Sequence, residues 1–325
     1  MAQKILSIVI PTYNMEDYLP RCLDSVTRED VPDSLEVIVV NDGSKDRSLE
    51  IAKEYQAKRP DIIQIIDKSN GHYGSCINAA LKTATGKYFR PLDADDWFDT
   101  NALIEFLNNL SEINDDLIFT SHTRHRKTRV IDVESKEIPY NTAFSVQDNS
   151  IIERLPSAYI SMHGITYKLQ ILKDCKLALS EGVCYTDSEY IFLPLRHTKT
   201  FRLLNLSLYN YDMTRDNQSV NPTVAAKNHS QFASVLKRML GVSNPYSLLE
   251  KKILCSCLRC YFYWLLFFCS ADKELKEMDY LLQQKDFLLK KMVYKDLMYA
   301  PLIWKFTGTH FFWYEKLKKI LKIDR

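Results

Sequence analysis

The stretch LEVIVVNDGSKDRSLEIAKEY, residues 35–55, decides the fold class. Its first six residues are almost all apolar and show no strict polar alternation, which is typical of a strand covered on both faces. After Gly43 the apolar residues recur at helical spacing. A buried strand followed directly by an amphipathic helix is one repeat of a parallel α/β sheet.

The same alternation of strand and helix recurs through the first 120 residues. Four further strands are expected, at residues 5–10, 61–67, 87–92 and 116–120. Repeated strand–helix–strand units have right-handed crossovers, and their ligands bind beyond the carboxyl ends of the strands. We therefore predict a mixed, mostly parallel α/β sheet flanked by helices, with the functional residues just after each strand.

The pattern changes further along the chain. A hairpin is expected around SKEIPYN (135–141), a helix at 187–197 and two short strands within 200–212. Beyond residue 221 the pattern is almost entirely helical. We predict a first domain over residues 1–222, with a nucleotide half (1–120) and an acceptor half (121–222), and an α-helical C-terminal domain over 223–325.

Charge is distributed unevenly along a chain whose formal net charge is +2. Residues 1–220 are net acidic, whereas residues 221–325 carry 18 Lys and Arg against 9 Asp and Glu. A basic C-terminal region suggests an anionic contact, which we take to be a membrane surface and not nucleic acid. Eight cysteines without a regular framework and the lack of a signal-peptide core favour a reduced, cytoplasmic protein.

The turns after the first two predicted strands carry polar and aromatic side chains. Pro11 and Thr12 end the first strand, and the ring of Tyr13 follows. Asp42 follows the second strand, where it can accept from an amide-like N–H, and Gly43 permits a tight turn. Taken alone, each could equally be an ordinary strand-to-helix turn.

The third turn, NGHYGSCINAAL (70–81), is rich in glycine and small polar residues. Gly74 would let the backbone approach a ligand, and Asn78 would supply a polar contact near a helix start. The segment matches neither the dinucleotide fingerprint nor the phosphate-loop pattern, so it disfavours both of those nucleotide folds.

The fourth predicted strand ends in Asp93-Ala94-Asp95-Asp96. Adjacent carboxylates repel one another unless a cation is present, and oxygen ligands of this kind suit Mg²⁺ or Mn²⁺. An alternative role remains for two acids at the end of this segment, because Asp96 or Asp99 could cap the next helix.

Three segments in this order, SIVIPTYNMEDYLPRCLDSV, LEVIVVNDGSKDRSLEIAKEY and NGHYGSCINAALKTATGKYFRPLDADDW, resemble the family 2 inverting glycosyltransferases with a GT-A fold. The likeness is strong over residues 5–110 and weak over 111–220. It implies a transferase that uses a nucleoside-diphosphate sugar, most often a UDP-sugar, together with Mn²⁺ or Mg²⁺.

The resemblance also implies roles for individual positions. Thr12 and Tyr13 would line the uracil and Asp42 would accept from the base N–H. Asp93 would hold the ribose or donor sugar, and Asp95 would bind the metal that bridges the diphosphate. The complete set of candidate donor-site residues is Pro11, Thr12, Tyr13, Asp42, Gly74, Asn78, Asp93, Ala94, Asp95 and Arg215.

The family has an acid at the start of a later helix, which deprotonates the acceptor hydroxyl. EGVCYTDSEYIFL (181–193) places Asp187 at that point, with Glu189 as the alternative. The segment LYNYDMTRDNQSV (208–220) is similar to a strand in polysaccharide-making members, so Arg215 and Ser219 would close over the diphosphate. Where many relatives have an Arg before Asn78 this chain has Ile77, and Arg90 or Arg215 would replace that cation.

The prediction is therefore an inverting glycosyltransferase that moves a sugar to a hydroxyl of a saccharide or lipid-linked saccharide acceptor. The alternative is a non-catalytic, nucleotide-binding scaffold of a polysaccharide assembly complex. The final segment, THFFWYEKLKKILKIDR (309–325), has the profile of an interfacial helix, and an ordinary amphipathic helix packed on the domain is the alternative. We expect a peripheral location on the inner face of the plasma membrane, with contact of the C-terminal helices to a partner subunit as the other interpretation. A homo-oligomer is also left open.

Overall fold

The protein was analysed as a computed structural model. The structure describes residues 3–127, 129–133, 137–215, 218–219, 221–242, 245–269 and 271–311. It divides into two compact units, Met1–Arg215 and Asp216–Arg325. The domain boundary near residue 222 remains a prediction.

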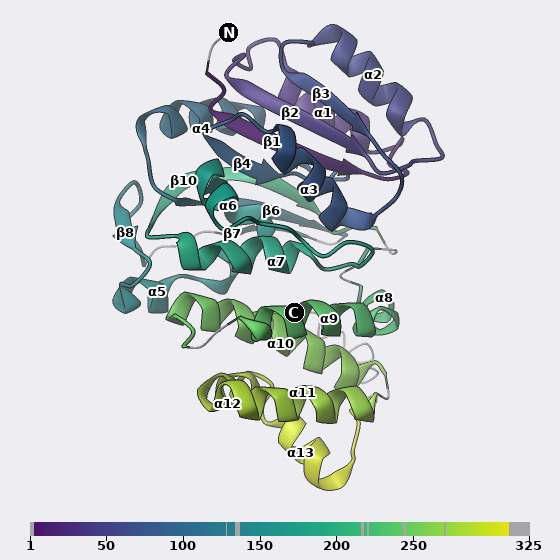
Figure 1. Cartoon of the computed structure of the whole chain (residues 1–325), viewed down its shortest axis with the longest axis vertical. Helices are drawn as coiled ribbons and strands as arrows, with labels where there is room; N and C mark the ends of the chain where they lie inside the picture. Colours follow the sequence, from purple (N-terminus) through teal and green to yellow (C-terminus); the bar gives the residue numbers. More distant parts are fainter. Residues whose placement is uncertain are drawn as a thin grey trace. The chain divides into compact units, whose positions relative to one another are not determined.

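A single mixed sheet forms the centre of the first unit, with strand order β3-β2-β1-β4-β9-β6-β10-β5 (Figure 1). Two further strands lie off this path, because β7 pairs with β6 and β8 pairs with β10. The strands are β1 (Leu6–Thr12), β2 (Leu35–Asn41), β3 (Ile63–Asp67), β4 (Tyr88–Pro91), β5 (Trp97–Phe98), β6 (Leu117–Arg126), β7 (Arg129–Val133), β8 (Ala143–Ser145), β9 (Ile165–Lys168) and β10 (Thr200–Asp212).

Four strands within residues 1–120 form a continuous parallel part of this sheet, and β6 and β10 form a second parallel pair. β1 pairs in parallel with both β2 and β4, and β2 pairs in parallel with β3. Every residue of β2 is buried, as the unbroken apolar pattern predicted. The predicted fold class, a mostly parallel α/β sheet flanked by helices with a helical C-terminal region, is confirmed.

Helices cover both faces of the sheet. Because α3 (His72–Thr83) returns across β2 and β1 to reach β4, it lies on the face opposite α1 (Leu19–Thr27) and α2 (Ser48–Lys58). α4 (Thr100–Glu112) contacts α1, whereas α6 (Leu169–Asp174) and α7 (Asp187–Phe192) share the face of α3, in front of the sheet in Figure 1. The short elements α5 (Asn149–Arg154), η1 (Ser157–Tyr159) and η2 (Met162–Gly164) precede β9, and η3 (Leu193–His197) follows α7.

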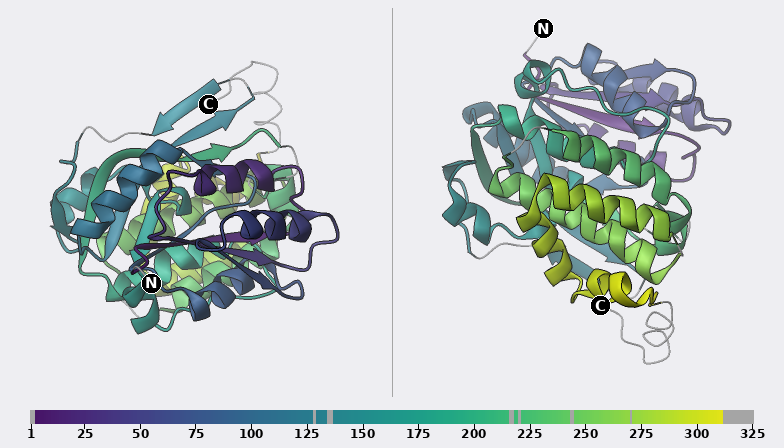
Figure 2. Two further views of the ribbon diagram at one scale, coloured as in Figure 1. Left: turned by 90° about the horizontal axis from the view of Figure 1, so that it is seen from above. Right: turned by 60° about the horizontal axis from the view of Figure 1, so that its bottom comes forward.

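Two predictions for the acceptor half were wrong in detail. The two short strands expected within residues 200–212 form one strand, β10, because its register shifts between Leu203 and Tyr209 let it continue past an irregularity. A hairpin lies earlier than expected, since β6 pairs antiparallel with β7 and Arg126 lies opposite Arg129 (Figure 2, left). Part of the segment expected to form it, 135–141, falls outside the described residues.

The second unit is helical. Its centre is α10 (Leu248–Phe267), which contacts α9 (His229–Gly241) and α12 (Phe287–Asp296) (Figure 2, right). The remaining helices are α8 (Pro222–Lys227), α11 (Asp272–Lys285) and α13 (Ala300–Thr307). A capping box fixes the start of α10, because Ser247 and Glu250 bond to each other's backbone. Within the described residues, no helix has the length and apolar character needed to cross a bilayer.

Candidate active site

The acidic turn after β4 is held by β10. Asp96 is completely buried and accepts hydrogen bonds from the Tyr209 hydroxyl (2.6 Å) and the Asp212 backbone N–H (2.7 Å). It does not cap the next helix, because Asp99 does so by accepting from the Ala102 N–H. The third carboxylate of the turn therefore fixes the geometry of the other two.

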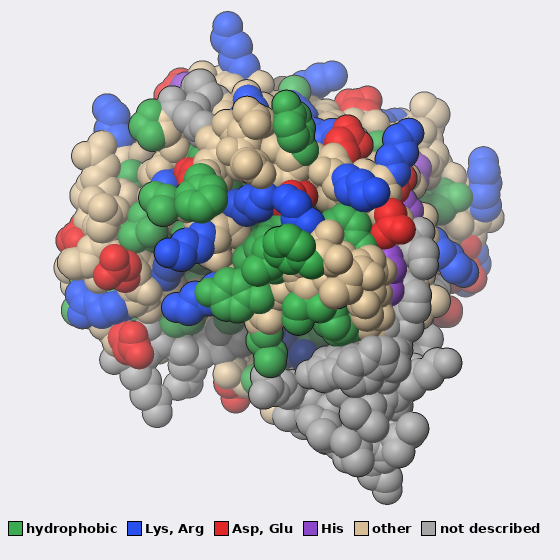
Figure 3. All heavy atoms as spheres, turned by 90° about the horizontal axis from the view of Figure 1, so that it is seen from below, with side chains coloured by type: hydrophobic (Ala, Val, Ile, Leu, Met, Phe, Trp, Pro, Cys, Tyr) green, Lys and Arg blue, Asp and Glu red, His purple; other side chains and the backbone are tan. Residues whose placement is uncertain are grey.

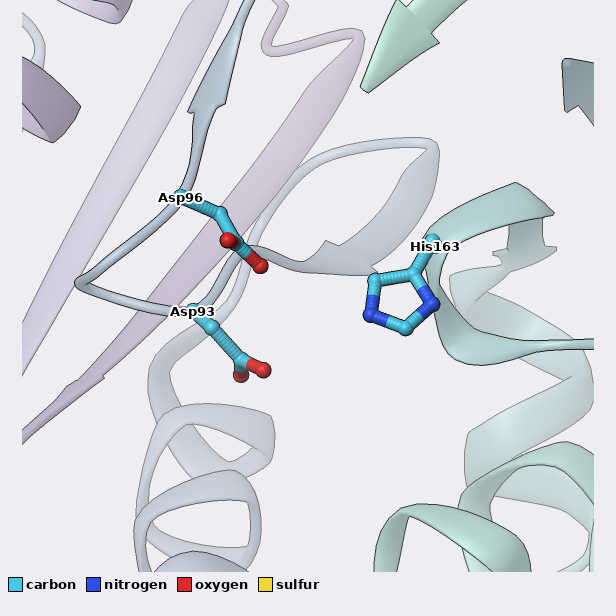
Figure 4. A group of neighbouring side chains, drawn as sticks. All are labelled: Asp93, Asp96 and His163. Atoms are coloured by element: carbon cyan, nitrogen blue, oxygen red, sulfur yellow. The ribbon is translucent and has the colours of Figure 1, made fainter. Parts of the chain in front are cut away.

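The carboxyl groups of this turn lie in a crowded, desolvated place. Desolvation raises the pKa of Asp93 well above its usual range, and the charges of Asp95 and Asp187 raise it further. Asp93, Asp96 and His163 each present a possible metal-ligating atom, all within 4.8 Å of one another, and Figure 4 shows the three side chains facing the same space. Asp95, the predicted metal ligand, is not part of this group.

Asp95 is instead paired with a cation. Its carboxylate forms a short, mostly buried ion pair with the Arg215 guanidinium, which also lies 4.8 Å from the ring centre of Tyr18. Arg21 donates to the Asp95 carbonyl oxygen (2.6 Å) and forms an ion pair with Asp212. Arg215 therefore neutralises the carboxylate that is the predicted metal ligand, and its contact with the diphosphate stays a prediction.

The predicted base-binding residues lie at the ends of two neighbouring strands. Thr12 is buried, and its carbonyl oxygen accepts from the Asp42 N–H at 2.8 Å. Tyr13 is 46% exposed, so its ring is available for stacking. The Asp42 carboxylate accepts from the Gly71 N–H (2.9 Å) and pairs with Lys68 (2.6 Å), a cation that sequence reasoning missed.

Gly74 and Asn78 contact protein rather than open space. A Cβ on Gly74 would meet the Ser180 carbonyl oxygen at 2.1 Å. The Asn78 amide accepts from the Leu179 N–H (2.7 Å) and donates to the Leu179 carbonyl oxygen (2.9 Å). Both residues therefore hold the segment 179–182 against α3, and a direct contact of either with the donor stays a prediction. Pro11 and Ala94 lie within β1 and the acidic turn respectively.

Asp187 and Glu189, the two candidates for the base, have different environments. Glu189 is completely buried and accepts from the Ser180 N–H (2.7 Å) and hydroxyl (2.8 Å), so it fixes the same 179–182 segment. Asp187 begins α7 and is close enough to Asp93 for its charge to raise the pKa of that group. Desolvation raises the pKa of Asp187 itself. This geometry favours Asp187.

Arg90 cannot supply the positive charge that many relatives have at the position of Ile77. Its side chain is completely buried and donates to Thr120 (3.1 Å), Thr166 (2.9 Å) and the His163 carbonyl oxygen. The expectation that Arg90 would serve the phosphate was wrong, because its side chain is buried against the sheet and does not reach the edge where ligands bind. Ser219 lies in the second unit, so its predicted position over the diphosphate stays a prediction.

The arrangement of the turns after β1, β2 and β4 agrees with the family to which the sequence matches. The model of the family described as "Glycosyl transferase family 2" matches residues 7–174, slightly more than half of the chain. The chain belongs to glycosyl transferase family 2. The matched region of this family 2 chain contains the turns after β1, β2 and β4, whereas Asp187 and Arg215 lie beyond it.

Two curated relatives of this family 2 chain are bacterial proteins. It is 30% identical to the uncharacterized glycosyltransferase EpsJ of Bacillus subtilis, over 64% of this chain and 60% of that protein. It is 31% identical to the chondroitin synthase of Pasteurella multocida, over 74% of this chain and 24% of the relative. The matched region thus spans less than two thirds of either relative.

Solved structures share the fold. The structure of a fragment of S. aureus TarS in complex with UDP-GlcNAc superposes with a TM-score of 0.65 at 18% identity, covering 94% of this chain and 92% of the other. The mannosyltransferase PcManGT of Pyrobaculum calidifontis, solved with GDP-Man and Mn²⁺, gives a TM-score of 0.52 at 14% identity, covering 94% and 88%. Both likenesses support the GT-A fold of this family 2 chain.

Proposed function

We propose that this protein transfers a sugar from a UDP-sugar to a hydroxyl of a saccharide or lipid-linked saccharide, with inversion at the anomeric carbon. The observation that carries the proposal is the position of Asp187, whose carboxyl group lies at the start of α7, close enough to Asp93 for its charge to raise the pKa of Asp93. A single displacement needs a base on one side of the anomeric carbon and stabilisation of the leaving group on the other. Asp187 would be the base, and the acidic turn would lie on the side of the leaving group.

The base needs a pKa close to the working pH. Desolvation raises the pKa of Asp187, which makes the carboxylate a stronger proton acceptor than an exposed aspartate. Its oxygen would take the proton of the acceptor hydroxyl as the bond to the anomeric carbon forms. Glu189 cannot easily do so because both of its oxygens are bound to Ser180.

The acidic turn fits a divalent cation. Its carboxylates supply hard oxygen donors, and the pKa of Asp93 is raised by desolvation and then by the charges of Asp95 and Asp187, both of which a bound cation would offset. Asp95, with Asp93 or Asp96 beside it, would hold Mn²⁺ or Mg²⁺, which when bound neutralises a diphosphate leaving group. Arg215 would contribute a second positive charge there after it leaves Asp95.

The donor and the pathway are proposed from the relatives and neighbours. The TarS structure contains UDP-GlcNAc, which supports a UDP-sugar, and the stacking position of Tyr13 suits a flat base. Chondroitin synthase among the relatives supports a role in polysaccharide or glycoconjugate synthesis. We therefore place the reaction in the assembly of a cell-surface glycan.

Replacement of the proposed base, Asp187, distinguishes an enzyme from a non-catalytic scaffold. We expect Asp187→Asn to bind UDP and Mn²⁺ as tightly as the wild type while its transfer rate falls by roughly 10²–10⁴-fold. The matched control is Glu189→Gln, which should lower the melting temperature because Ser180 loses a charged partner. UDP-sugar hydrolysis and transfer are measured by UDP release from a panel of donors. An Asp187→Asn protein that turns over at the wild-type rate would refute the proposal.

We also propose that the second unit touches an anionic membrane. Large apolar side chains are exposed on α12, on α13 and in the segment between them (Figure 3), namely Phe287, Leu288, Met298, Leu302, Ile303 and Phe306. Lys291, Lys295 and Lys305 are exposed among them. Apolar side chains interleaved with lysines suit the interface of an anionic bilayer. The predicted interfacial segment 309–325 lies mostly outside the described residues.

Vesicle sedimentation tests this contact. Full-length protein should pellet with phosphatidylglycerol vesicles more than with phosphatidylcholine vesicles, and less as salt is raised. Met298→Asp with Phe306→Asp should abolish pelleting. The matched control is Val130→Asp, which changes an exposed apolar residue of β7 in the first unit. Equal pelleting of the double variant and the wild type would rule out this surface.

A further inference from the structure

A row of basic side chains extends along one face of β6 toward the edge that carries the acidic turn. His122, Arg124 and Arg126 alternate along the strand, so all three point to the same face. On the adjacent strand, Tyr209 lies opposite His122 and Tyr211 lies opposite Arg124. The row starts at a completely buried residue, His122, and ends at the half-buried Arg126.

Arg124 lies in this row without an acidic partner. Its Nε donates to His122 Nε2 at 3.0 Å, and no carboxylate of the described chain lies within ion-pair distance of it. The residues directly opposite on the two neighbouring strands are Tyr211 and Ile131, neither of which is acidic. Burial and the charge of Arg126 lower the pKa of Arg124. A half-buried guanidinium normally has an anionic partner, because its desolvation is otherwise uncompensated.

Two imidazoles beside Arg124 have unused polar atoms. Because His122 Nε2 accepts a hydrogen bond, its Nδ1 carries the hydrogen, and this buried N–H has no acceptor in the described structure. Burial lowers the pKa of His122 to about 3, so the ring is neutral at physiological pH. His163 stacks on Tyr211 with ring centres 4.0 Å apart, and its own Nδ1 is likewise buried and unpaired. A guanidinium and an unsatisfied N–H are the donors that an oxyanion requires.

The row begins beside the acidic turn and continues on strands that lie on the far side of β4 from the first three strands of the sheet. His163 lies within 4.8 Å of possible ligand atoms on Asp93 and Asp96, so the row begins beside the reaction centre. In the sheet, β6 and β10 are separated from the nucleotide strands β1, β2 and β3 by β4 and β9. An anion bound here would therefore enter from the acceptor side.

We propose that Arg124, with His122 and His163, forms a subsite for an oxyanion carried by the acceptor. The anion is a phosphate or a carboxylate next to the sugar or polyol hydroxyl that receives the new bond. The guanidinium fork would make paired, charge-assisted hydrogen bonds to two oxygens of either group. This proposal rests on the proposed glycosyl transfer and adds to it a class of acceptor, one that is negatively charged.

The test uses the full-length protein and two calorimetric titrations. UDP with Mn²⁺ is titrated first, and its affinity should be the same within about twofold in the wild type, Arg124→Gln and Arg124→Lys. Lack of UDP binding by the wild type would contradict the proposed function and not this subsite. The control Arg47→Gln removes the exposed arginine that precedes α2 and pairs with Glu50.

Three acceptor probes of similar size are then titrated in the presence of UDP and Mn²⁺: a glycerol phosphate oligomer, a uronate-containing tetrasaccharide and neutral chitotetraose. We expect one anionic probe to bind at least about tenfold more tightly than the neutral one, with an affinity that falls as salt is raised. Arg124→Gln should lose about tenfold for that probe, Arg124→Lys less, and Arg47→Gln nothing. The preferred probe tells phosphate from carboxylate. Equal affinity of Arg124→Gln and wild type for both anionic probes, or tightest binding of chitotetraose, would overturn the proposal.

Discussion

Asp93 shows how a functional residue can destabilise the fold that holds it. Its pKa is raised by desolvation and by neighbouring carboxylates, so its ionised form is less favourable in the folded protein than in the unfolded chain. For such a group, the folded state binds the proton more tightly. Its contribution to stability therefore decreases as pH rises from the unfolded pKa, about 4, through the higher folded pKa.

We expect Asp93→Asn to raise the melting temperature of the metal-free protein at neutral pH, by about 2–4 °C for each kcal/mol of desolvation cost and repulsion removed. The gain should disappear near pH 4, where the wild-type carboxyl group is protonated. Scanning calorimetry with EDTA across this pH range measures it. Asp30→Asn is the matched control, because Asp30 is exposed beside Arg28 and its pKa is lowered, which gives the opposite sign. A lower melting temperature for Asp93→Asn at neutral pH would contradict this account.

Arg215 competes with any cation that approaches Asp95. We expect Arg215→Gln to bind Mn²⁺ more tightly than the wild type in the absence of nucleotide, because the carboxylate loses its internal partner. The same variant should bind UDP with Mn²⁺ less tightly, since the diphosphate loses a guanidinium. Electron paramagnetic resonance of free Mn²⁺ reads both affinities. Weaker Mn²⁺ binding by Arg215→Gln without nucleotide would show that the ion pair does not compete.

At the scale of elements, α3 holds the segment 179–182 in place, and this segment in turn contacts α7. Gly74 and Asn78 position residues 179–182, and Glu189 binds the same segment from α7, which begins with Asp187. A side chain at position 74 would collide with backbone and not with a flexible side chain. The glycine-rich turn thus connects the nucleotide half to the predicted base.

We therefore expect Gly74→Ala to lower kcat for transfer by at least about tenfold while the affinity for UDP and Mn²⁺ changes little, because the displaced segment is bound to Glu189 of the helix that begins with Asp187. The control is Gly241→Ala at the end of α9, where an added Cβ meets nothing within 4 Å and the melting temperature should stay the same or rise. Steady-state kinetics and nucleotide titration separate the two effects. An unchanged kcat would mean that the segment shifts without moving the base.

The sequence predicted the elements of the nucleotide half well because each strand there is a short apolar run followed by its own turn. β1, β2, β4 and β6 overlap the predicted strands, and the acids after β4 lie at the edge where they were expected. It could not predict that Gly74 faces Ser180 or that His163 faces Asp93. Those contacts join residues far apart in the chain, and no local pattern encodes them.

At the scale of the molecule, the two units contain separate hydrophobic cores, one around the sheet and one around α10. We expect scanning calorimetry of the full chain to show two unfolding transitions. UDP with Mn²⁺ should raise the temperature of only one of them, because a ligand stabilises the unit that binds it. A single transition that shifts as a whole on ligand addition would contradict the domain division predicted near residue 222.

The pairing of Arg215 with Asp95 also bears on the order in which substrates load. A free divalent ion would have to displace a guanidinium that is covalently part of the chain, and it would leave that guanidinium without a counter-charge. A nucleotide that arrives already chelated brings a diphosphate, onto which Arg215 can transfer as the ion takes its place. Substrate binding would then be an exchange, in which Asp95 takes the ion and Arg215 takes the diphosphate. In a cell rich in divalent ions but poor in sugar nucleotide, the site would stay closed by its own arginine.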